Sequence, residues 1–415
     1  MLSHPFGRLA LASALGVFAW PVHAEPLTLQ AAIGRTLASN PSLRAEGAAV
    51  AAYEQQLQLD GLAPALTLGA ELENIGGTGA VSNTGGAETT LRLGKVFELG
   101  GKRAARQQRG LAEIARQENA VTRRRLDLAA ETTKRFIAVV ETQDELALAV
   151  RQVALTQETE AAVQQRVDRG VSPAGDVALA QIAVARAELA REHAEHELES
   201  SRFALVALWG EAAPQPIDAT AELLTLPDLP AFESLAERLT RTPEAVAYTL
   251  DTAKLDADRG VAQAAARPDL ALTAGVRRLE AIDDQALVFS FSMPLGSSHR
   301  SGHAVGRIDA ELEAVAARRD AAMLEARQLL FARYQELRHA RTEVQSLTDR
   351  MIPAADRGLS LTRAGYDDAR YSILQLTQAQ NTLLQLQQER LVAAARYHTL
   401  LAEIERSTAD AGVTP

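Results

Sequence analysis

The chain has 415 residues and a formal net charge of −10 at pH 7, because 53 Asp and Glu outnumber 43 Lys and Arg. This acidity argues against a nucleic acid partner, since phosphate binding needs clustered basic side chains. The chain contains no cysteine, which excludes disulfides, Cys-based metal sites and a thiol nucleophile.

The N-terminal residues 1–24 have the features of a secretory signal peptide. An apolar run at 9–20 follows a basic start, and Val22 and Ala24 place small residues before a cut at Glu25. The run is shorter than the roughly 20 apolar residues that span a bilayer. The alternative is an N-terminal anchor that stays attached.

The rest of the chain contains one unit twice, about 200 residues apart. The matching segments are 35–43, 62–75, 93–106 and 167–181 in the first copy, and 238–246, 266–280, 289–302 and 366–380 in the second. A nearly constant offset over four landmarks indicates a duplicated architecture. The predicted organisation is therefore a signal peptide, a first repeat, a linker, a second repeat and a tail, at 1–24, 25–210, 211–230, 231–406 and 407–415.

Each repeat contains a pair of short strands with alternating apolar and polar residues. In the first, residues 65–74 alternate clearly, whereas 89–97 is less regular because Lys95 shares a face with two leucines. A Gly- and Asn-rich stretch between them predicts a long exposed loop. In the second repeat, the alternation continues through 270–277 and 287–293, with a tight turn at Asp283 and Asp284.

The helices are too long for a compact domain. Residues 111–169 contain neither Gly nor Pro, and such a helix extends roughly 90 Å at 1.5 Å per residue. The second repeat is likewise free of both at 307–352 and again at 366–411. Apolar residues follow a heptad-like spacing, and Ala and Gln on the flanks suit a ring of helices. An ordinary two-stranded coiled coil is the alternative.

The strands decide between these readings. Strands of about 9–11 residues with one apolar face suit the wall of a membrane β-barrel. Four strands cannot close a barrel, for which about eight is the minimum, so their edges must pair with other copies of the chain. Three copies supply twelve strands. The alternative, a small soluble sheet capping a coiled coil, leaves an apolar face uncovered.

The duplicated order of helix, hairpin, long helix, turn and helix resembles that of TolC-like outer membrane efflux proteins over nearly all of the mature chain. The segment ELGGKRAAR at 98–106 resembles the heavy-metal (cobalt–zinc–cadmium) branch. The resemblance implies a mainly α homotrimer, in which a 12-strand β-barrel in outer membrane lipid continues into a 12-helix periplasmic tube. Its role would be the exit duct of a tripartite pump, working with a periplasmic adaptor protein and an inner-membrane efflux transporter. The sequence leaves the cargo open between heavy-metal cations and organic compounds.

The resemblance also implies an adaptor-docking tip where each helix pair turns. The first tip, Gly170, Val171 and Ser172, matches the usual Gly followed by Ser or Thr. The second tip departs from that pattern, because Ala stands where Gly is usual. Its residues are Ala369, Arg370, Tyr371 and Ser372. Since Ala tolerates positive φ poorly, the expected turn is in question there.

The family often has acidic residues at the pore constriction, six residues beyond the tip glycine. The first repeat has Asp176 at this position, whereas the second has Gln375, followed one turn later by Gln378. The resemblance therefore implies a constriction that is largely neutral.

Other chemistry is not predicted. His193 and His196, or His299 and His303, have helical spacings that suit Zn²⁺ with a third ligand, but a solvated helix face is the preferred interpretation. The sequence has no phosphate loop, dinucleotide fingerprint or nucleophile elbow. We therefore expect no enzyme activity, no cofactor and no bound metal. The alternative to an efflux duct is a soluble periplasmic coiled-coil scaffold.

Overall fold

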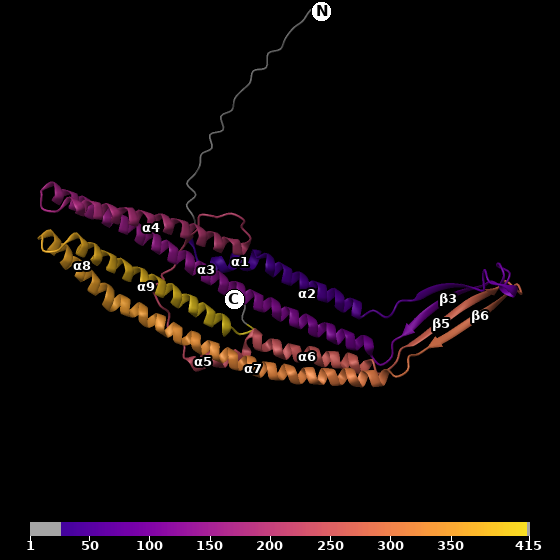
Figure 1. The fold of residues 1–415 in the computed structure, drawn as a ribbon. Coiled ribbons are helices and arrows are strands. Elements are labelled where there is room, and N and C mark those ends of the chain that lie inside the picture. The colour runs from indigo at the N-terminus through magenta and orange to yellow at the C-terminus, as the bar shows by residue number, and fades with distance from the viewer. Residues whose placement is uncertain (1–25, 413–415) are drawn as a thin grey trace, which may run out of the picture.

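The computed structural model describes residues 26–412, and the predicted signal peptide at 1–24 lies outside this range. The molecule is a long rod with helices along most of its length. A sheet lies at one end, and at the other end lie two turns that each join two helices, one at residues 169–173 and one at residues 368–372 (Figure 1). Within residues 26–412, no helix combines the length and the apolarity that crossing a membrane requires.

The two repeats have the same order of elements, as predicted. The first contains α1 (Leu29–Ser39), α2 (Pro41–Asp60), β2 (Thr67–Glu73), β3 (Glu88–Phe97), α3 (Lys102–Asp168) and α4 (Ala174–Val206). The second contains α5 (Phe232–Arg238), α6 (Pro243–Ala264), β5 (Leu270–Leu279), β6 (Asp284–Ser292), α7 (Ser297–Ser346), α8 (Ile352–Asp367) and α9 (Ile373–Ser407).

Helix α3 is longer than the sequence predicted, with 67 residues. It starts at Lys102 and passes through Gly110, where the pattern had suggested a boundary. Gly110 lies against α2, and a Cβ at this position would approach the Leu57 side chain to 2.9 Å. The glycine therefore permits a close helix contact and does not end the helix.

The long helix of the second repeat differs from its prediction at Pro353. The sequence predicted a helix ending at Ile352, but a π-helical turn, Leu347–Met351, joins α7 directly to α8. Proline lacks an N–H and its ring clashes with the carbonyl four residues earlier in an α-helix. The wider turn accommodates both, so helical structure continues to Asp367. The next helix then begins at Ile373 and not at 366.

The two strand pairs form one antiparallel sheet in the order β2-β3-β5-β6, so β2 and β6 are its edges. One row across the sheet aligns Leu68, Leu93, Ala274 and Phe289. The large side chains of this row are 51–74% exposed, and they lie on a continuous apolar face. Lys95 shares that face but directs its amine to the Pro64 carbonyl, 2.8 Å away, at the end of the sheet nearest the helices. This contact accounts for the irregular pattern of β3.

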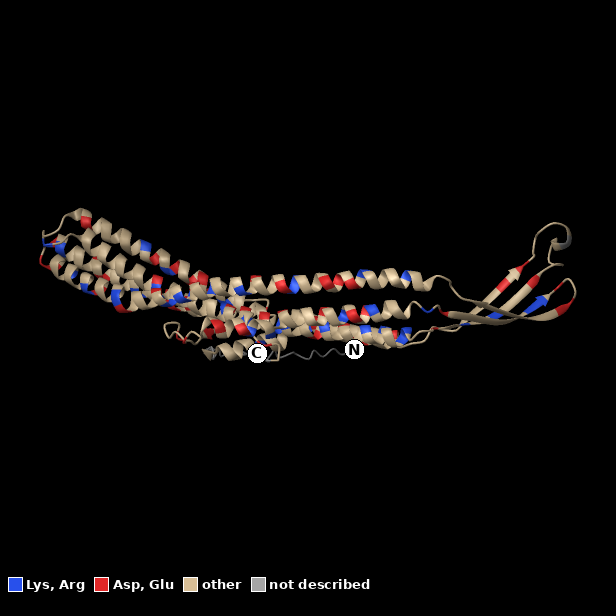
Figure 2. Cartoon of the chain, turned by 90° about the horizontal axis from the view of Figure 1, so that it is seen from below, with Lys and Arg blue, Asp and Glu red and all other residues tan. Residues whose placement is uncertain are grey.

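The helices lie in parallel columns, and basic and acidic residues are interspersed along their length (Figure 2). Helices α2 and α4 both pack on α3, one toward each end of the rod, and α6 and α9 both pack between α3 and α7 (Figure 1). Helices α2 and α4 thus form one column beside α3, and α6 and α9 form another column between α3 and α7.

Connecting segments pack against the rod near its middle (Figure 1). Here β1 (Pro26–Leu27) pairs in parallel with β4 (Asp218–Ala219). Gln143 of α3 holds β4 by exchanging two hydrogen bonds with the Ala219 backbone, at 3.0 and 2.9 Å. The main apolar cluster beneath contains Phe136, Ile217 and Ala394.

Candidate functional site

The first of the two connections at this end of the rod joins α3 to α4, and α3 ends there at a residue in the left-handed backbone conformation. Gly170 has φ +72°, and the Val171 N–H donates to the Arg166 carbonyl at 2.9 Å. This six-residue closure is a common way to end a helix. Pro173 then precedes α4, whose first turn contains Asp176 in a half-buried position.

The second turn has the same geometry although it lacks the glycine. Ala369 has φ +60°, and the Arg370 N–H donates to the Gly365 carbonyl at 2.7 Å. The substitution of Ala for Gly therefore changes the energy of the turn and not its path, since L-residues tolerate this conformation at a cost of roughly 1–2 kcal/mol.

A capping box starts α9. The Ser372 N–H donates to Oε1 of Gln375 at 2.9 Å, and the Gln375 N–H donates to the Ser372 hydroxyl at 3.4 Å. The Gln375 side chain thus satisfies a helix N-terminus. Asp176 has the equivalent position in α4, where a carboxylate is favoured by the helix dipole. Helix capping alone therefore accounts for the residue types at these two predicted constriction positions.

The structure brings the two turns together through residues that the sequence analysis had not assigned to the site. The Arg166 guanidinium donates to the Tyr366 carbonyl at 2.8 Å and lies 4.5 Å from the Tyr366 ring centre. Burial raises the pKa of the Tyr366 hydroxyl. Beneath this contact, Val163, Ala180 and Ile373 form an apolar cluster with Tyr366. Arg166 aligns with Gly365 of the second repeat, a mismatch that could have indicated a special role.

The predicted docking residues differ in their surroundings. Val171 and Tyr371 are 55% and 45% exposed. The Tyr371 ring covers Gly365, where an added Cβ would approach a ring carbon to 2.2 Å. Among the described residues, no hydrogen bond or ion pair joins Asp176 to Gln375 or Gln378. The docking and constriction assignments remain predictions.

The segment 98–106, which suggested the heavy-metal branch, forms the junction between strand and helix. Arg106 pairs with Glu98 at 3.0 Å and lowers the pKa of that carboxyl. Lys102 pairs with Asp269 of the second repeat at 2.6 Å. Gly100 has φ +82°, and a Cβ there would approach the Ala264 carbonyl to 2.9 Å. The segment thus fixes how β3 enters α3.

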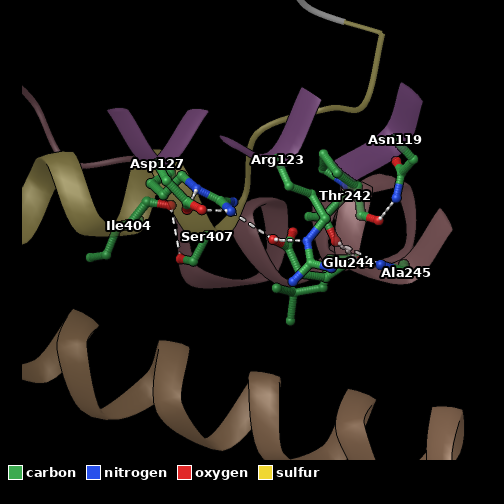
Figure 3. Close-up of polar contacts among 11 residues, drawn as sticks. Asn119, Arg123, Asp127, Thr242, Glu244, Ala245, Ile404 and Ser407 are labelled. Carbon is green, nitrogen blue, oxygen red and sulfur yellow. Dashed lines mark hydrogen bonds and ion pairs between the residues drawn. The ribbon is translucent and has the colours of Figure 1, made fainter. Parts of the chain in front are cut away.

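A polar network joins α9 to α6 near the middle of the rod. Arg406 donates to Asp127 and to Glu244, both at 2.7 Å, and the Thr242 hydroxyl accepts from the Ala245 N–H at 3.3 Å (Figure 3). Burial by itself would raise the pKa of Glu244, but the hydrogen bond and the charge of Arg406, together with a backbone hydrogen bond and the charge of Arg123, outweigh burial and lower that pKa. The C-terminal end of α9 is therefore joined to the N-terminal end of α6.

A cavity of about 730 Å³ lies beside this network, lined by α3, α6, α7 and α9. Several charged residues of its lining form ion pairs, among them Arg333 with Glu403 at 3.2 Å and Arg135 with Glu131 at 2.8 Å. Farther along α3, burial and the neighbouring Glu145 raise the pKa of Glu141 to about 7.

The histidine pairs have no metal-site geometry around them. His299 and His303 stack edge to face at 4.9 Å, and His196 lies 3.9 Å from Glu192. Among residues 26–412, no group of three or more potential ligands lies close enough to hold a metal ion.

Comparison with known proteins agrees with this architecture. Residues 32–211 match the outer membrane efflux protein family. The chain is 28% identical over 368 residues to the cobalt-zinc-cadmium resistance protein CzcC of Cupriavidus metallidurans, covering 87% of this chain and 85% of that protein.

Two solved structures show the same fold. CusC, described in connection with transmembrane channel formation, has a TM-score of 0.72 at 17% identity, with 98% of this chain and 99% of CusC covered. The open state of the Neisseria gonorrhoeae MtrE outer membrane channel has a TM-score of 0.73 at 20% identity, with 92% and 88% covered. The resemblance to TolC-like outer membrane efflux proteins and their heavy-metal branch is thereby confirmed. The chain is located in the outer membrane and extends into the periplasm.

Proposed function

We propose that three copies of this chain form the exit duct of a tripartite efflux pump. The observation that carries the proposal is the four-stranded sheet, whose edge strands β2 and β6 have no partner within the described chain and whose apolar face is exposed. Unpaired edges and bare apolar surface both cost free energy in water, and both are removed when sheets join into a lipid-embedded barrel. Three copies give twelve strands.

The number of helical columns in each chain equals its number of strands in the sheet. Each level of the rod has four columns, which are α2, α3, α6 and α7 near the sheet, and α4, α3, α9 and α7–α8 near the turns. Three copies give a tube of twelve helices. Helix α3 alone extends roughly 100 Å, at 1.5 Å for each of its 67 residues. This length suits a conduit that reaches far into the periplasm.

The two turns are the proposed docking site for a periplasmic adaptor protein, which couples the duct to an inner-membrane transporter. They lie at the end of the rod farthest from the sheet (Figure 1). Gly170 to Ser172 and Ala369 to Ser372 supply this surface, and Asp176, Gln375 and Gln378 line the constriction just inside it. The chain acts as a passive conduit, and its organisation is two efflux repeats, 25–210 and 231–406, joined by a linker at 211–230.

The proposed cargo is heavy-metal cations. The similarity to the cobalt-zinc-cadmium resistance protein CzcC over most of both chains supports it. Deleting the gene should sensitise cells to cobalt, zinc or cadmium, and re-expression should restore resistance.

Oligomeric state and membrane association test the proposal directly. The full chain should sediment with the outer membrane and, after extraction in mild detergent, give a trimer mass by light scattering. A monomer in detergent would exclude the closed barrel. A chain that stays in the soluble periplasmic fraction would instead favour the coiled-coil scaffold.

A further inference from the structure

The polar face of the sheet has its charges on one half only. The half nearest the helices is neutral, with one row aligning Thr67, Gly94, Thr273 and Ser290. The half nearest the loops contains all six charged residues of this face, namely Glu71, Glu73, Glu88, Arg92, Arg277 and Asp284. In a barrel whose apolar face meets lipid, this band lies inside, at the outer mouth.

Arg277 is the centre of the band and connects three strands. From β5, its guanidinium donates to Glu88 of β3 at 2.7 Å and to Glu73 of β2 at 3.0 Å. Its Nε also donates to the Thr90 hydroxyl at 3.0 Å. One positive charge is thus shared between two carboxylates.

Arg92 lies flat on the sheet between two glycines. A Cβ at Gly69 would lie 3.5 Å from the Arg92 side chain, and one at Gly275 would lie 2.9 Å from it. The Arg92 guanidinium pairs with Glu71 on the adjacent strand. Because both neighbours in this row lack side chains, the passage stays wide while the charge stays close to the wall.

The balance of the band is negative, since four carboxylates face two guanidiniums. Asp284 is the member without an ion pair among the described residues, and its carboxylate accepts only from the Gln285 N–H, at 2.8 Å. A passage with low-dielectric walls and one predominant sign of charge concentrates ions of the opposite sign.

We propose that this band is the charge filter of the duct and makes its outer mouth selective for cations over anions. The proposal rests on the proposed function, because it needs the sheet closed into a barrel with this face inward. The band thus gives the duct a specificity element at its outer end. The opposite end, where turns connect the helices, has the neutral residues Gln375 and Gln378.

Neighbouring residues of one turn provide a matched pair of variants. Asp284 lies on the polar face, whereas the Asp283 carboxylate pairs with Arg278, which lies on the apolar face. Asp283 has φ +55°, a conformation that Asn also tolerates. Asp284→Asn and Asp283→Asn therefore remove the same charge, one residue apart, from opposite sides of the wall.

The experiment is the reversal potential of the full-length protein in a planar bilayer under a KCl gradient. We expect Asp284→Asn to lower the K⁺/Cl⁻ permeability ratio roughly two-fold and Asp283→Asn to leave it unchanged. Arg277→Gln should raise the ratio, because it releases two carboxylates, and Arg277→Lys should retain the wild-type ratio as a control for folding. The wild-type preference should fade at 1 M salt, where the Debye length is about 3 Å.

An equal effect of Asp283→Asn and Asp284→Asn, or no effect of Asp284→Asn, would overturn the filter while leaving the duct intact. Absence of any channel activity in the wild type would instead count against the duct itself.

Discussion

Gly170 and Ala369 adopt the same left-handed backbone conformation at equivalent helix ends, with φ values of +72° and +60°. Glycine reaches this region freely, whereas a Cβ makes it costly. The second turn therefore retains a strain that the first has avoided.

Exchanging the two residue types should exchange this strain. We expect Ala369→Gly to stabilise the protein by about 0.5–1 kcal/mol, since the relief of strain exceeds the entropy that glycine loses on folding. Gly170→Ala should destabilise it by about 1 kcal/mol. Thermal unfolding in detergent, followed by circular dichroism, measures both. A lower melting temperature for Ala369→Gly would show that the second turn is not strained.

Gly170→Val tests the docking surface. A β-branched residue is strongly disfavoured at positive φ, so the turn should be displaced. We expect loss of efflux and of cross-linking to the adaptor, with normal abundance and trimer mass. Gly175→Ala is the control, because Gly175 also has open space around its Cβ position and has no positive φ. Normal efflux in Gly170→Val at normal abundance would remove the assignment of this turn.

Arg166→Ala should loosen the contact between the two turns. The variant loses a charge-assisted hydrogen bond, worth about 1.5–3 kcal/mol in general, together with the stacking on Tyr366. Because the helix ends are then free to separate, we expect a larger single-channel conductance. Arg169→Ala removes an exposed arginine three residues away and should leave the conductance as it was.

The proposed constriction can be tested by adding charge. Gln378 is exposed and has no part in the capping box, so Gln378→Asp changes charge without removing that cap. We expect stronger cation selectivity and block by multivalent cations. If the wild type already shows such block and Asp176→Asn alone abolishes it, the largely neutral constriction is wrong.

The raised pKa of Glu141, about 7, gives a defined dependence on pH. The folded protein binds this proton more tightly than the unfolded chain, whose carboxyl has the ordinary glutamate pKa of 4.5. Stability should therefore fall as the pH rises from 4.5 to about 7. Glu141→Gln should remove this loss, so the variant becomes more stable than the wild type above pH 7. The exposed Glu118→Gln on the same helix serves as the control. A pH-independent difference between Glu141→Gln and the wild type would contradict the assignment.

The sequence predicted the features that depend on periodicity. The repeats, the strand pairs and the long helices follow from spacing and from the absence of Gly and Pro, which act locally. Features that depend on a partner far along the chain were not accessible. Examples are the pairing of β3 with β5, which unites the two hairpins, and the contact of Arg166 with Tyr366.

The rules that proline and glycine end helices also predicted two helix boundaries that the structure does not have, because neighbouring structure accommodates both residues. Pro353 was expected to end a helix, but the π-helical turn before it absorbs the missing hydrogen bond. Gly110 was expected to delimit α3, but it lies inside the helix against Leu57. At Ala369, the sequence indicated a departure and the backbone instead preserved the turn.

The end-to-end joining of α9 to α6, and of α4 to α2, has a consequence for how the chain tolerates change. Asn40 donates to the Leu208 carbonyl at 2.6 Å at one joint, and Arg406 reaches Glu244 at the other. These contacts keep the helices of each column aligned, although the chain does not run directly from one helix of a column to the other. A reporter domain inserted into the exposed stretch 211–216 should therefore leave the helical wall undisturbed, which offers a site for labelling the assembled duct in living cells.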